Sequence, residues 1–209
     1  MNRRFDLIVF DWDGTLFDST ACADLGVPVP SDEQASWVIG LGLVDALQRA
    51  APSLPRERYR ELGDRYRHHY FARQHELTLF EGSLEMLHAL KGRGHLLGVA
   101  TGKSRRGLDE ALASSQLAGL FDATRTADET ASKPDPLMLH ELMAELGVDA
   151  GKTLMIGDTT HDLQLAANAG TVAVGVGYGA HAHGNFEGYD TAHVAHSVAG
   201  LRDWLLRHG

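Results

Sequence analysis

The sequence predicts an α/β protein with a doubly wound parallel sheet and a small helical cap inserted after the first strand. Short apolar runs that suit buried strands alternate with amphipathic helical patterns from about residue 81 to the end. Such alternation is typical of a parallel sheet with helices on both faces. The stretch from residue 16 to residue 80 has no clear strand pattern. We therefore expect residues 1–15 and 81–209 to form the α/β core and residues 16–80 to form the helical cap.

The candidate strands are short runs of apolar residues. The first, residues 7–10, reads LIVF, and continuous runs of this kind are typical of strands buried on both faces. Three later runs have the same character, and two more are weaker candidates. The clear runs are residues 96–100, 153–156 and 171–174, and the weaker ones are residues 121–124 and 192–194.

Helical patterns lie between these runs. Apolar residues recur at the spacing of one helix face in four segments, near residues 84–90, 108–112, 139–146 and 163–167. Ser104 is a suitable N-cap for the second of them, and Gly170 a suitable stop for the last. In the cap, helices are expected at about residues 32–50 and 56–75, with Pro52 and Pro55 between them.

Composition narrows the possible functions. The 209 residues carry a formal net charge of −9, which disfavours a broad nucleic-acid interface because both surfaces would be negative. The single cysteine, Cys22, allows no disulfide framework within the chain. The N-terminal segment has the pattern of neither a signal peptide nor a membrane span. We therefore expect a cytoplasmic protein with neither a nucleic-acid nor a membrane partner, while its oligomeric state is not predicted.

Polar residues follow the predicted strands where the strands end. The carboxyl ends of parallel strands share one edge of a sheet, and ligands bind at that edge. Carboxylates suit a magnesium ion that also binds a phosphate, and a carboxylate is able to attack phosphorus. A hydroxyl, a backbone amide and a lysine suit the phosphate itself. The candidate residues are Asp11, Asp13, Thr101, Gly102, Lys133, Asp158 and Asp162.

Two segments and two single residues of this set resemble, in order along the chain, the four motifs of the haloacid dehalogenase (HAD) superfamily. They are the segment 11–19, DWDGTLFDS, then Thr101, Lys133 and the segment 157–162, GDTTHD. The continuation 163–170, LQLAANAG, is similar to the phosphoglycolate phosphatase-like branch. The resemblance extends over essentially the whole chain. It implies a Rossmann-like core and a magnesium-dependent phosphatase that hydrolyses small phosphomonoesters, with 2-phosphoglycolate as the leading substrate, through an aspartyl-phosphate intermediate.

The resemblance also implies roles for the aspartates. Asp11 is expected to be the nucleophile and a ligand of Mg²⁺. Asp13 is expected to be the general acid–base, and its backbone carbonyl to bind the metal as well. Asp158 would complete the metal ligands contributed by the protein, with Asp162 supporting the metal or a bound water. Asp162 also suits a plain early-helix carboxylate stabilised by the helix dipole.

The remaining matches concern the phosphate. Thr101, the amide of Gly102 and Lys133 are expected to hold it. Lys103, directly beside them, is predicted to be a solvated surface charge. The glycine-rich segment 40–42 has two interpretations, a loop that faces the site and helps to select the substrate, or a plain helix break.

Several alternatives stay open. A 2-haloacid dehalogenase of the same superfamily needs no metal and lacks the second aspartate, so Asp13 disfavours it. A sugar-phosphate mutase would form an isomer instead of releasing phosphate, and a non-catalytic scaffold would not need these carboxylates. The segment 20–26 is short for the first cap helix, which indicates either a truncated cap or a segment absent from the sequence. His181, His183, His193 and His196 are predicted to be ordinary loop residues and not a metal site.

Overall fold

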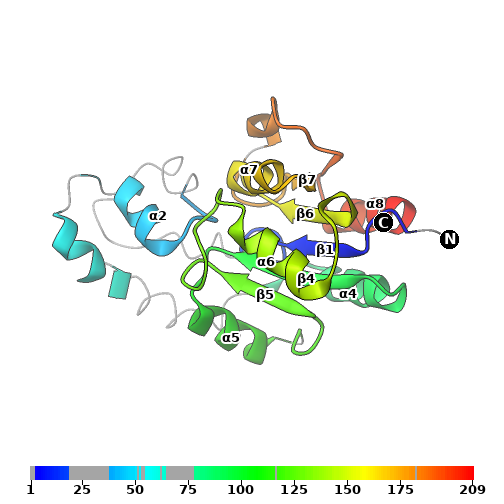
Figure 1. Cartoon of the computed structure of the whole chain (residues 1–209), viewed down its shortest axis with the longest axis horizontal. Helices are drawn as coiled ribbons and strands as arrows, with labels where there is room; N and C mark the ends of the chain where they lie inside the picture. The colour runs from blue at the N-terminus through cyan, green and yellow to red at the C-terminus, as the bar shows by residue number, and fades with distance from the viewer. Residues whose placement is uncertain are drawn as a thin grey trace.

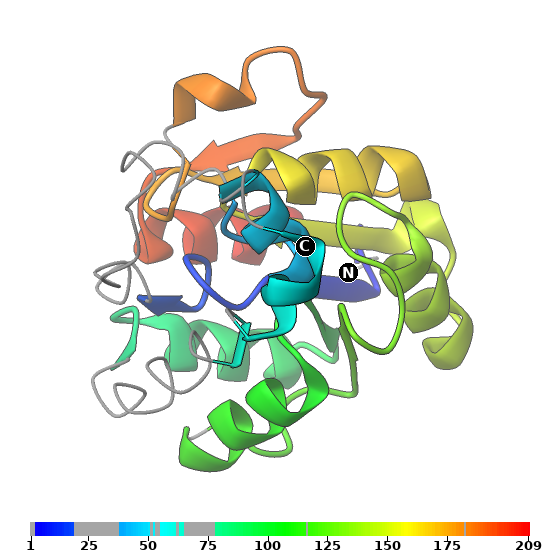
Figure 2. The same cartoon turned by 90° about the vertical axis from the view of Figure 1, so that its left-hand side faces the viewer.

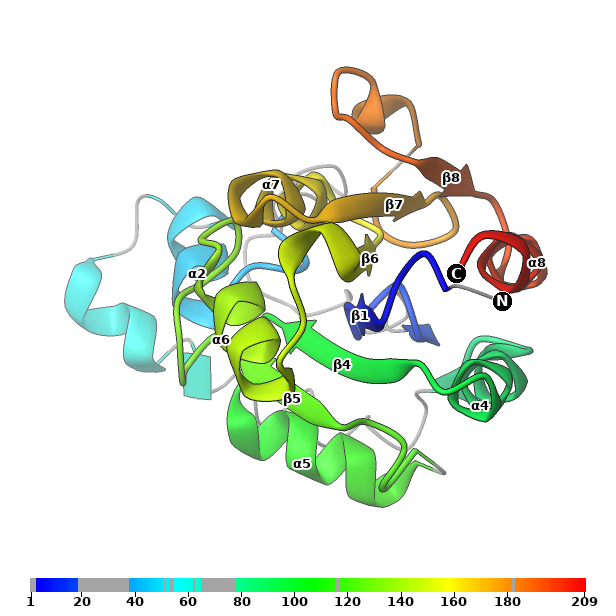
Figure 3. The same cartoon turned by 45° about the vertical axis from the view of Figure 1, so that its right-hand side comes forward.

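The computed structural model describes residues 3–18, 38–50, 52, 55–61, 63–64, 78–115, 117–181 and 183–209. Its main feature is a six-stranded sheet in the order β5-β4-β1-β6-β7-β8 (Figure 3). Every neighbouring pair in this sheet is parallel, which confirms the predicted fold class. The strands are β1 (Leu7–Phe10), β4 (Leu96–Thr101), β5 (Ala123–Thr126), β6 (Thr153–Gly157), β7 (Val172–Val176) and β8 (His193–Ala195).

Strand β1 lies at the centre of the sheet. Leu7 is opposite Leu96 of β4 on one side and Thr153 of β6 on the other. Successive side chains of a strand point to opposite faces, and both faces are covered here. Ile8 and Phe10 therefore join one apolar cluster, while Leu7 and Val9 join the other. This is why all four residues of the LIVF run are apolar.

Helices of the described part of the chain cover both faces of the sheet (Figure 3). The first cluster takes apolar residues from α4 (Ser83–Gly92), α5 (Arg105–Ser114) and α8 (Val198–His208). The second takes them from α6 (Leu137–Leu146) and α7 (Thr160–Ala169). The predicted helix ends are confirmed, because Ser104 accepts a hydrogen bond from the Gly107 amide and Gly170 ends α7 in the left-handed conformation. None of the helices in the described part of the chain is long and apolar enough to cross a membrane.

Two details of the sheet differ from prediction. The weak candidate at residues 121–124 lies two residues too early, since β5 begins at Ala123. Phe121 instead packs near the ring of Trp12, and the Asp122 carboxylate accepts a hydrogen bond from the Leu97 amide. The second difference is a short antiparallel pair, β2 (Phe17–Asp18) with β3 (Thr78–Leu79), in a stretch predicted to contain no strand. Strands of two residues are too short to show a periodic pattern.

The described part of the predicted cap lies beyond the carboxyl edge of the sheet (Figures 1 and 2). Helix α2 (Leu43–Ala50) begins later than the predicted residue 32, because residues 38–40 form a turn in which Gly40 has a φ of 87°. The short helix η2 (Arg56–Arg58) opens the second predicted helix. The predicted short first cap helix and the end of the second helix lie outside the described residues. The boundaries 16–80 for the cap stay a prediction. Two further short helices lie outside the cap. Helix η4 (Ala150–Lys152) directly precedes β6, and helix η5 (His183–Phe186) follows β7.

Helix α6 offers a matched test of this packing. Leu139 is fully buried against the sheet, whereas Leu137 on the same helix is 39% exposed. We expect Leu139→Ala to lower the free energy of unfolding by about 2–5 kcal/mol, because it removes buried methyl groups and leaves a cavity. Leu137→Ala should cost less than about 1 kcal/mol. Urea unfolding of both variants measures the difference, and equal losses would contradict the packing described.

Candidate active site

The predicted site residues meet at the carboxyl edge of the sheet. Asp11 directly follows β1, Thr101 is the last residue of β4, and Asp158 directly follows β6. The Asp11 amide donates to the carbonyl of Ile156 at 2.8 Å, which fixes the first carboxylate against the end of β6. Asp11, Thr101 and Asp158 are all at most 1% exposed. Parallel strands that end at the same level therefore bring together residues almost 150 positions apart.

Lys133 lies at the centre of this group and bridges two carboxylates. Its Nζ is 2.7 Å from Asp11 Oδ1 and 2.6 Å from Asp162 Oδ1, and none of the three side chains is more than 1% exposed. Burial alone would lower the pKa of Lys133, but the charges of Asp11 and Asp162 outweigh it and raise that pKa above its ordinary value. The lysine therefore stays an ammonium group.

Asp162 has two partners, one for each oxygen. Its Oδ2 accepts hydrogen bonds from the amide of Thr159 at 3.0 Å and from the Thr159 hydroxyl at 2.7 Å. This arrangement caps the N-terminus of α7. Its Oδ1 faces Lys133. The structure thus supports both interpretations of this residue, because a helix-capping carboxylate also belongs to the acidic cluster.

Asp158 is held by two hydrogen bonds. Thr15 donates its hydroxyl to Oδ1 at 3.0 Å, and the Ala180 amide donates to Oδ2 at 2.7 Å. Burial and the nearby charge of Asp162 raise the pKa of Asp158 to about 7, with the two hydrogen bonds opposing the rise. Gly14 has a φ of 78°, and a Cβ at this position would collide with the Asp158 carboxylate. Only glycine fits at this turn.

Asp11, Asp158 and Asp162 form a cluster in which one oxygen of each lies within 4.8 Å of the others. It is the one such group of three or more in the part of the chain that the structure describes. Burial raises the pKa of Asp11 well above its ordinary value. Lys133 opposes the rise, while the charges of Asp162 and Asp158 add to it. The three carboxylates share a single ammonium group, that of Lys133, and the negative charge that remains suits a hard divalent cation such as Mg²⁺.

Asp13 lies outside this cluster and has a lysine of its own. Lys103 Nζ is 3.0 Å from Asp13 Oδ2, and the Lys103 side chain is 8% exposed. The prediction that Lys103 is a solvated charge is therefore wrong. Sequence reasoning missed it because Asp13 and Lys103 are distant in the chain and meet only where β1 and β4 end side by side.

Each of the two carboxylates that follow β1 retains one oxygen without a partner. Asp11 Oδ2 and Asp13 Oδ1 are buried and accept no hydrogen bond from the described residues. Their other oxygens are paired with Lys133 and Lys103, respectively. Buried polar atoms are normally hydrogen-bonded, so a buried oxygen without a partner needs an explanation. A bound ligand that contacts both free oxygens would provide one.

The segment 40–42 lies against the phosphate-binding candidates. A Cβ at Gly102 would collide with the carbonyl oxygens of Gly40 and Leu41, so only glycine is compatible with this approach. The Gly42 amide donates to Ser132 Oγ at 2.7 Å, next to Lys133. Of the two interpretations of this segment, the structure favours a loop that faces the site. Thr101 Oγ1 accepts a hydrogen bond from the Lys103 amide at 3.2 Å.

The loop after β7 forms another wall of the site, which the sequence did not indicate. His181 is 3% exposed, and its Nδ1 accepts a hydrogen bond from the Thr160 amide at 3.2 Å. The Tyr178 hydroxyl donates to the Thr15 carbonyl at 3.3 Å. These contacts fix the loop that presents the Ala180 amide to Asp158. His181 lies in a loop, as predicted, but its side chain is buried beside Asp158.

Comparisons with known proteins identify the family. The family described as haloacid dehalogenase-like hydrolase matches residues 8–176. A Dickeya dadantii protein named probable phosphatase IndB is 37% identical over 190 residues, covering 84% of this chain and 82% of the relative. A phosphoglycolate phosphatase from Aliivibrio fischeri is 33% identical over 197 residues, covering 86% and 87% of the two chains.

The solved structures agree on the fold. The crystal structure of a hydrolase from Pseudomonas syringae superposes with a TM-score of 0.86 at 21% identity, covering 97% of this chain and 98% of the other. The family match covers both ends of the candidate site, from Asp11 to Asp162. The chain therefore belongs to the haloacid dehalogenase-like hydrolase family.

Proposed function

We propose that this enzyme is a magnesium-dependent phosphatase that hydrolyses small phosphomonoesters, such as 2-phosphoglycolate, through an aspartyl-phosphate on Asp11. The observation that carries the proposal is the pair of carboxylates after β1. Each has one oxygen paired with a lysine and the other buried without a hydrogen-bond partner among the described residues. Asp11 and Asp13 thus present two oriented oxygens toward a ligand, as a nucleophile and an acid–base require.

The first step transfers the phosphoryl group to the enzyme. Asp11 Oδ2 forms a bond to phosphorus while the bond between phosphorus and the leaving oxygen breaks. Asp13 gives a proton from Oδ1 to that oxygen, so the product leaves as a neutral alcohol group. Lys133 keeps Asp11 Oδ1 occupied, which leaves Oδ2 as the attacking atom.

The second step returns the enzyme to its starting state. Asp13, now ionised, takes a proton from a water molecule, and the water oxygen forms a bond to phosphorus. The bond between phosphorus and Asp11 Oδ2 breaks, which releases inorganic phosphate and the free carboxylate. Asp13 ends the cycle protonated, so protons and charges balance over the two steps.

Other residues hold the phosphate and the metal. Thr101 and the Gly102 amide lie at the end of β4 and are proposed to bind phosphate oxygens together with Lys133. Asp11, Asp158 and the Asp13 carbonyl are proposed to bind Mg²⁺, with Asp162 in support. Mg²⁺, when bound, offsets the repulsion between these carboxylates and an anionic substrate. When Asp13 is ionised, the four carboxylates carry two more charges than Lys103 and Lys133 together, which favours a divalent cation.

The proposed substrate is small and anionic. The loop 40–42 lies directly against Gly102 and Ser132, on the side from which a substrate would approach. The Aliivibrio fischeri relative named phosphoglycolate phosphatase supports 2-phosphoglycolate as the first compound to assay. The single cysteine of the chain supports a cytoplasmic location.

Asp11→Asn tests the nucleophile. The change is nearly isosteric but replaces the attacking oxygen by an amide group or a neutral carbonyl. We expect phosphate release from 2-phosphoglycolate to fall at least about 10³-fold, which corresponds to roughly 4 kcal/mol of activation free energy. Asp203→Asn, at an exposed position on α8, is the matched control and should retain the wild-type rate.

The same assay separates the rival reactions. Wild-type rates in Asp11→Asn would remove Asp11 from the mechanism. Halide release from a 2-haloacid in the presence of a chelator, without phosphate release from any monoester, would establish a dehalogenase instead. Formation of an isomeric phosphate ester without free phosphate would establish a mutase.

Thermal unfolding with and without Mg²⁺ tests the metal site. Mg²⁺ should raise the Tm of the wild type, because it binds only the folded cluster. Asp158→Asn should lose this response. The Tm of its metal-free form should equal or exceed that of the wild type, since one buried charge is gone. A metal response that is unchanged in Asp158→Asn would contradict the assignment.

The metal response should also depend on pH. The pKa of Asp158 is raised to about 7 in the metal-free protein, so the folded state binds more protons than the unfolded state between its ordinary pKa and pH 7. The metal-free protein therefore loses stability as the pH rises through this range. Mg²⁺ must displace these protons. Its effect on Tm should be larger at about pH 8 than at about pH 5.5, and the reverse order would contradict the pKa shift.

A further inference from the structure

Lys103 is a nearly buried cation that takes no part in the two proposed reaction steps. Its ammonium group lies 3.0 Å from Asp13 Oδ2, and its side chain is 8% exposed, compared with 21% for Asp13. Surface ion pairs of this protein are far more open, as Arg106 and Glu110 on α5 show with side-chain exposures of 80% and 38%. An enclosed pair restricts the geometry of both side chains more than a surface pair does.

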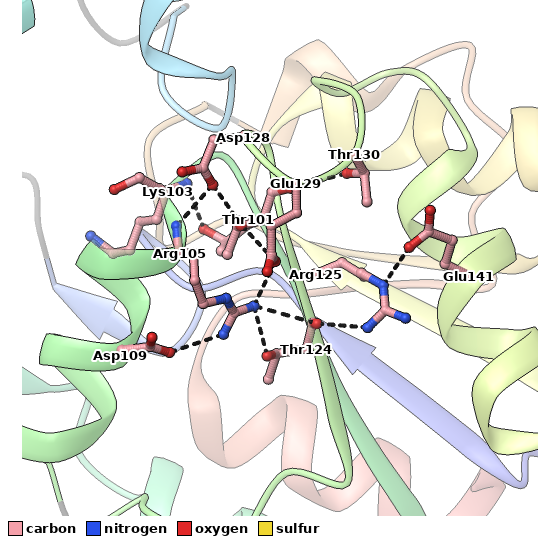
Figure 4. Close-up of polar contacts among 12 residues, drawn as sticks. Thr101, Lys103, Arg105, Asp109, Thr124, Arg125, Asp128, Glu129, Thr130 and Glu141 are labelled. Atoms are coloured by element: carbon pink, nitrogen blue, oxygen red, sulfur yellow. Dashed lines mark hydrogen bonds and ion pairs between the residues drawn. The ribbon is translucent and has the colours of Figure 1, made fainter.

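The backbone of Lys103 is fixed on both sides. Its amide donates to Thr101 Oγ1 at 3.2 Å, and its carbonyl accepts from the Ala127 amide at 3.2 Å. The next residues continue this brace, which Figure 4 shows. The Arg105 amide donates to Asp128 Oδ1 at 2.8 Å, and the Arg105 side chain is 2.9 Å from Glu129 Oε2. The lysine therefore extends from a rigid loop between β4 and α5.

We propose that Lys103 is a positioning residue, which binds Asp13 Oδ2 so that Asp13 Oδ1 is the oxygen that exchanges the proton with the substrate. This inference rests on the proposed function of Asp13 as the general acid–base. The pairing supports it directly. Oδ2 is occupied by the lysine, while Oδ1 is buried and accepts no hydrogen bond from any described residue.

The hydrogen-bonding capacity of lysine gives this pairing a chemical consequence. An ammonium group has three donors and no acceptor, so the oxygen that faces it acts only as an acceptor. When Asp13 carries a proton, that proton must therefore be on Oδ1. Lys103 thus selects which oxygen carries the proton and prevents the carboxyl group from turning the wrong oxygen toward the leaving group. A misplaced proton donor loses rate even when the substrate is bound normally.

Leaving-group dependence distinguishes this role from a purely structural one. The kinetic constant kcat/KM reports the steps up to the first cleavage of the P–O bond. Alkyl phosphates need a proton on the leaving oxygen, whereas p-nitrophenyl phosphate releases a stable phenolate without one. In Lys103→Met, kcat/KM for ethyl phosphate should fall about 10²-fold, within the range of general acid catalysis. For p-nitrophenyl phosphate the loss should be less than about 5-fold.

Two variants control for folding and charge. Lys103→Arg retains a cation that only donates, so it should recover much of the activity on ethyl phosphate that Lys103→Met loses. Lys91→Met removes a lysine from a pair with Asp122, 2.8 Å apart and remote from the site, and should leave both substrates unaffected. Circular dichroism and the Tm of each variant show whether the fold is intact.

A double-mutant cycle with Asp13→Asn completes the test. If Lys103 acts through Asp13, adding Lys103→Met to Asp13→Asn should lower kcat/KM for ethyl phosphate by less than about 3-fold. Full, additive losses in the double variant, or equal losses on both substrates in Lys103→Met, would overturn the inference while the phosphatase assignment stands. A wild-type protein that releases phosphate from no monoester, 2-phosphoglycolate included, would instead overturn the proposed function, and this inference with it.

Discussion

The site depends on one buried ammonium group, that of Lys133, shared between Asp11 and Asp162. Removing one partner of a buried ion pair leaves a charge in a poorly solvated place, at a cost of about 3–5 kcal/mol. Three separate segments converge on this point, namely the end of β1, the loop before α6 and the first turn of α7. The ion pair therefore links the end of β1 to the start of α7, and the same contact orients the carboxylate of Asp11, the proposed nucleophile.

At the carboxyl edge of the sheet, negative charge exceeds positive charge when no ligand is bound. Asp158 has hydrogen bonds from Thr15 and Ala180, but its charge has no lysine in contact among the described residues. Burial raises the pKa of Asp158 to about 7 and that of Asp11 well above its ordinary value, and the charges of neighbouring carboxylates add to both shifts. Functional sites commonly contain groups that lower the stability of the folded protein. In the proposed metal site, this excess of negative charge would favour a divalent cation.

The sequence predicted the core of the fold well because burial on both faces leaves a simple pattern. Residues 7–10, 96–100 and 154–156 form continuous runs without charged or polar side chains, and each lies in a central strand. The aspartates were found because they follow these strands and match an ordered set of motifs. Strand β5 was placed two residues early, since Phe121 packs on Trp12 and not within the strand. The β2–β3 pair was missed because each strand has only two residues.

The ion pair of Lys103 and the burial of His181 were not predicted, for a different reason. A lysine two residues after a strand looks the same whether solvent or a carboxylate faces it. Its burial depends on Asp13, which reaches the same edge from another strand. His181 is buried by a loop that folds back over Asp158, and loops carry little periodic pattern. The burial of both side chains depends on contacts between segments that are distant in the sequence. Local sequence patterns carry no information about such contacts.

The proposed function depends on one step, in which Asp11, held at one oxygen by Lys133, accepts the phosphoryl group on its other oxygen. Rapid acid quenching of the wild type during turnover of a ³²P-labelled monoester, followed by peptide mapping, measures this most directly. The account predicts label in the peptide that contains Asp11, stable in acid and released by hydroxylamine, as expected for an acyl phosphate. A protein that turns over the monoester with no labelled peptide, or with the label on another residue, would contradict it.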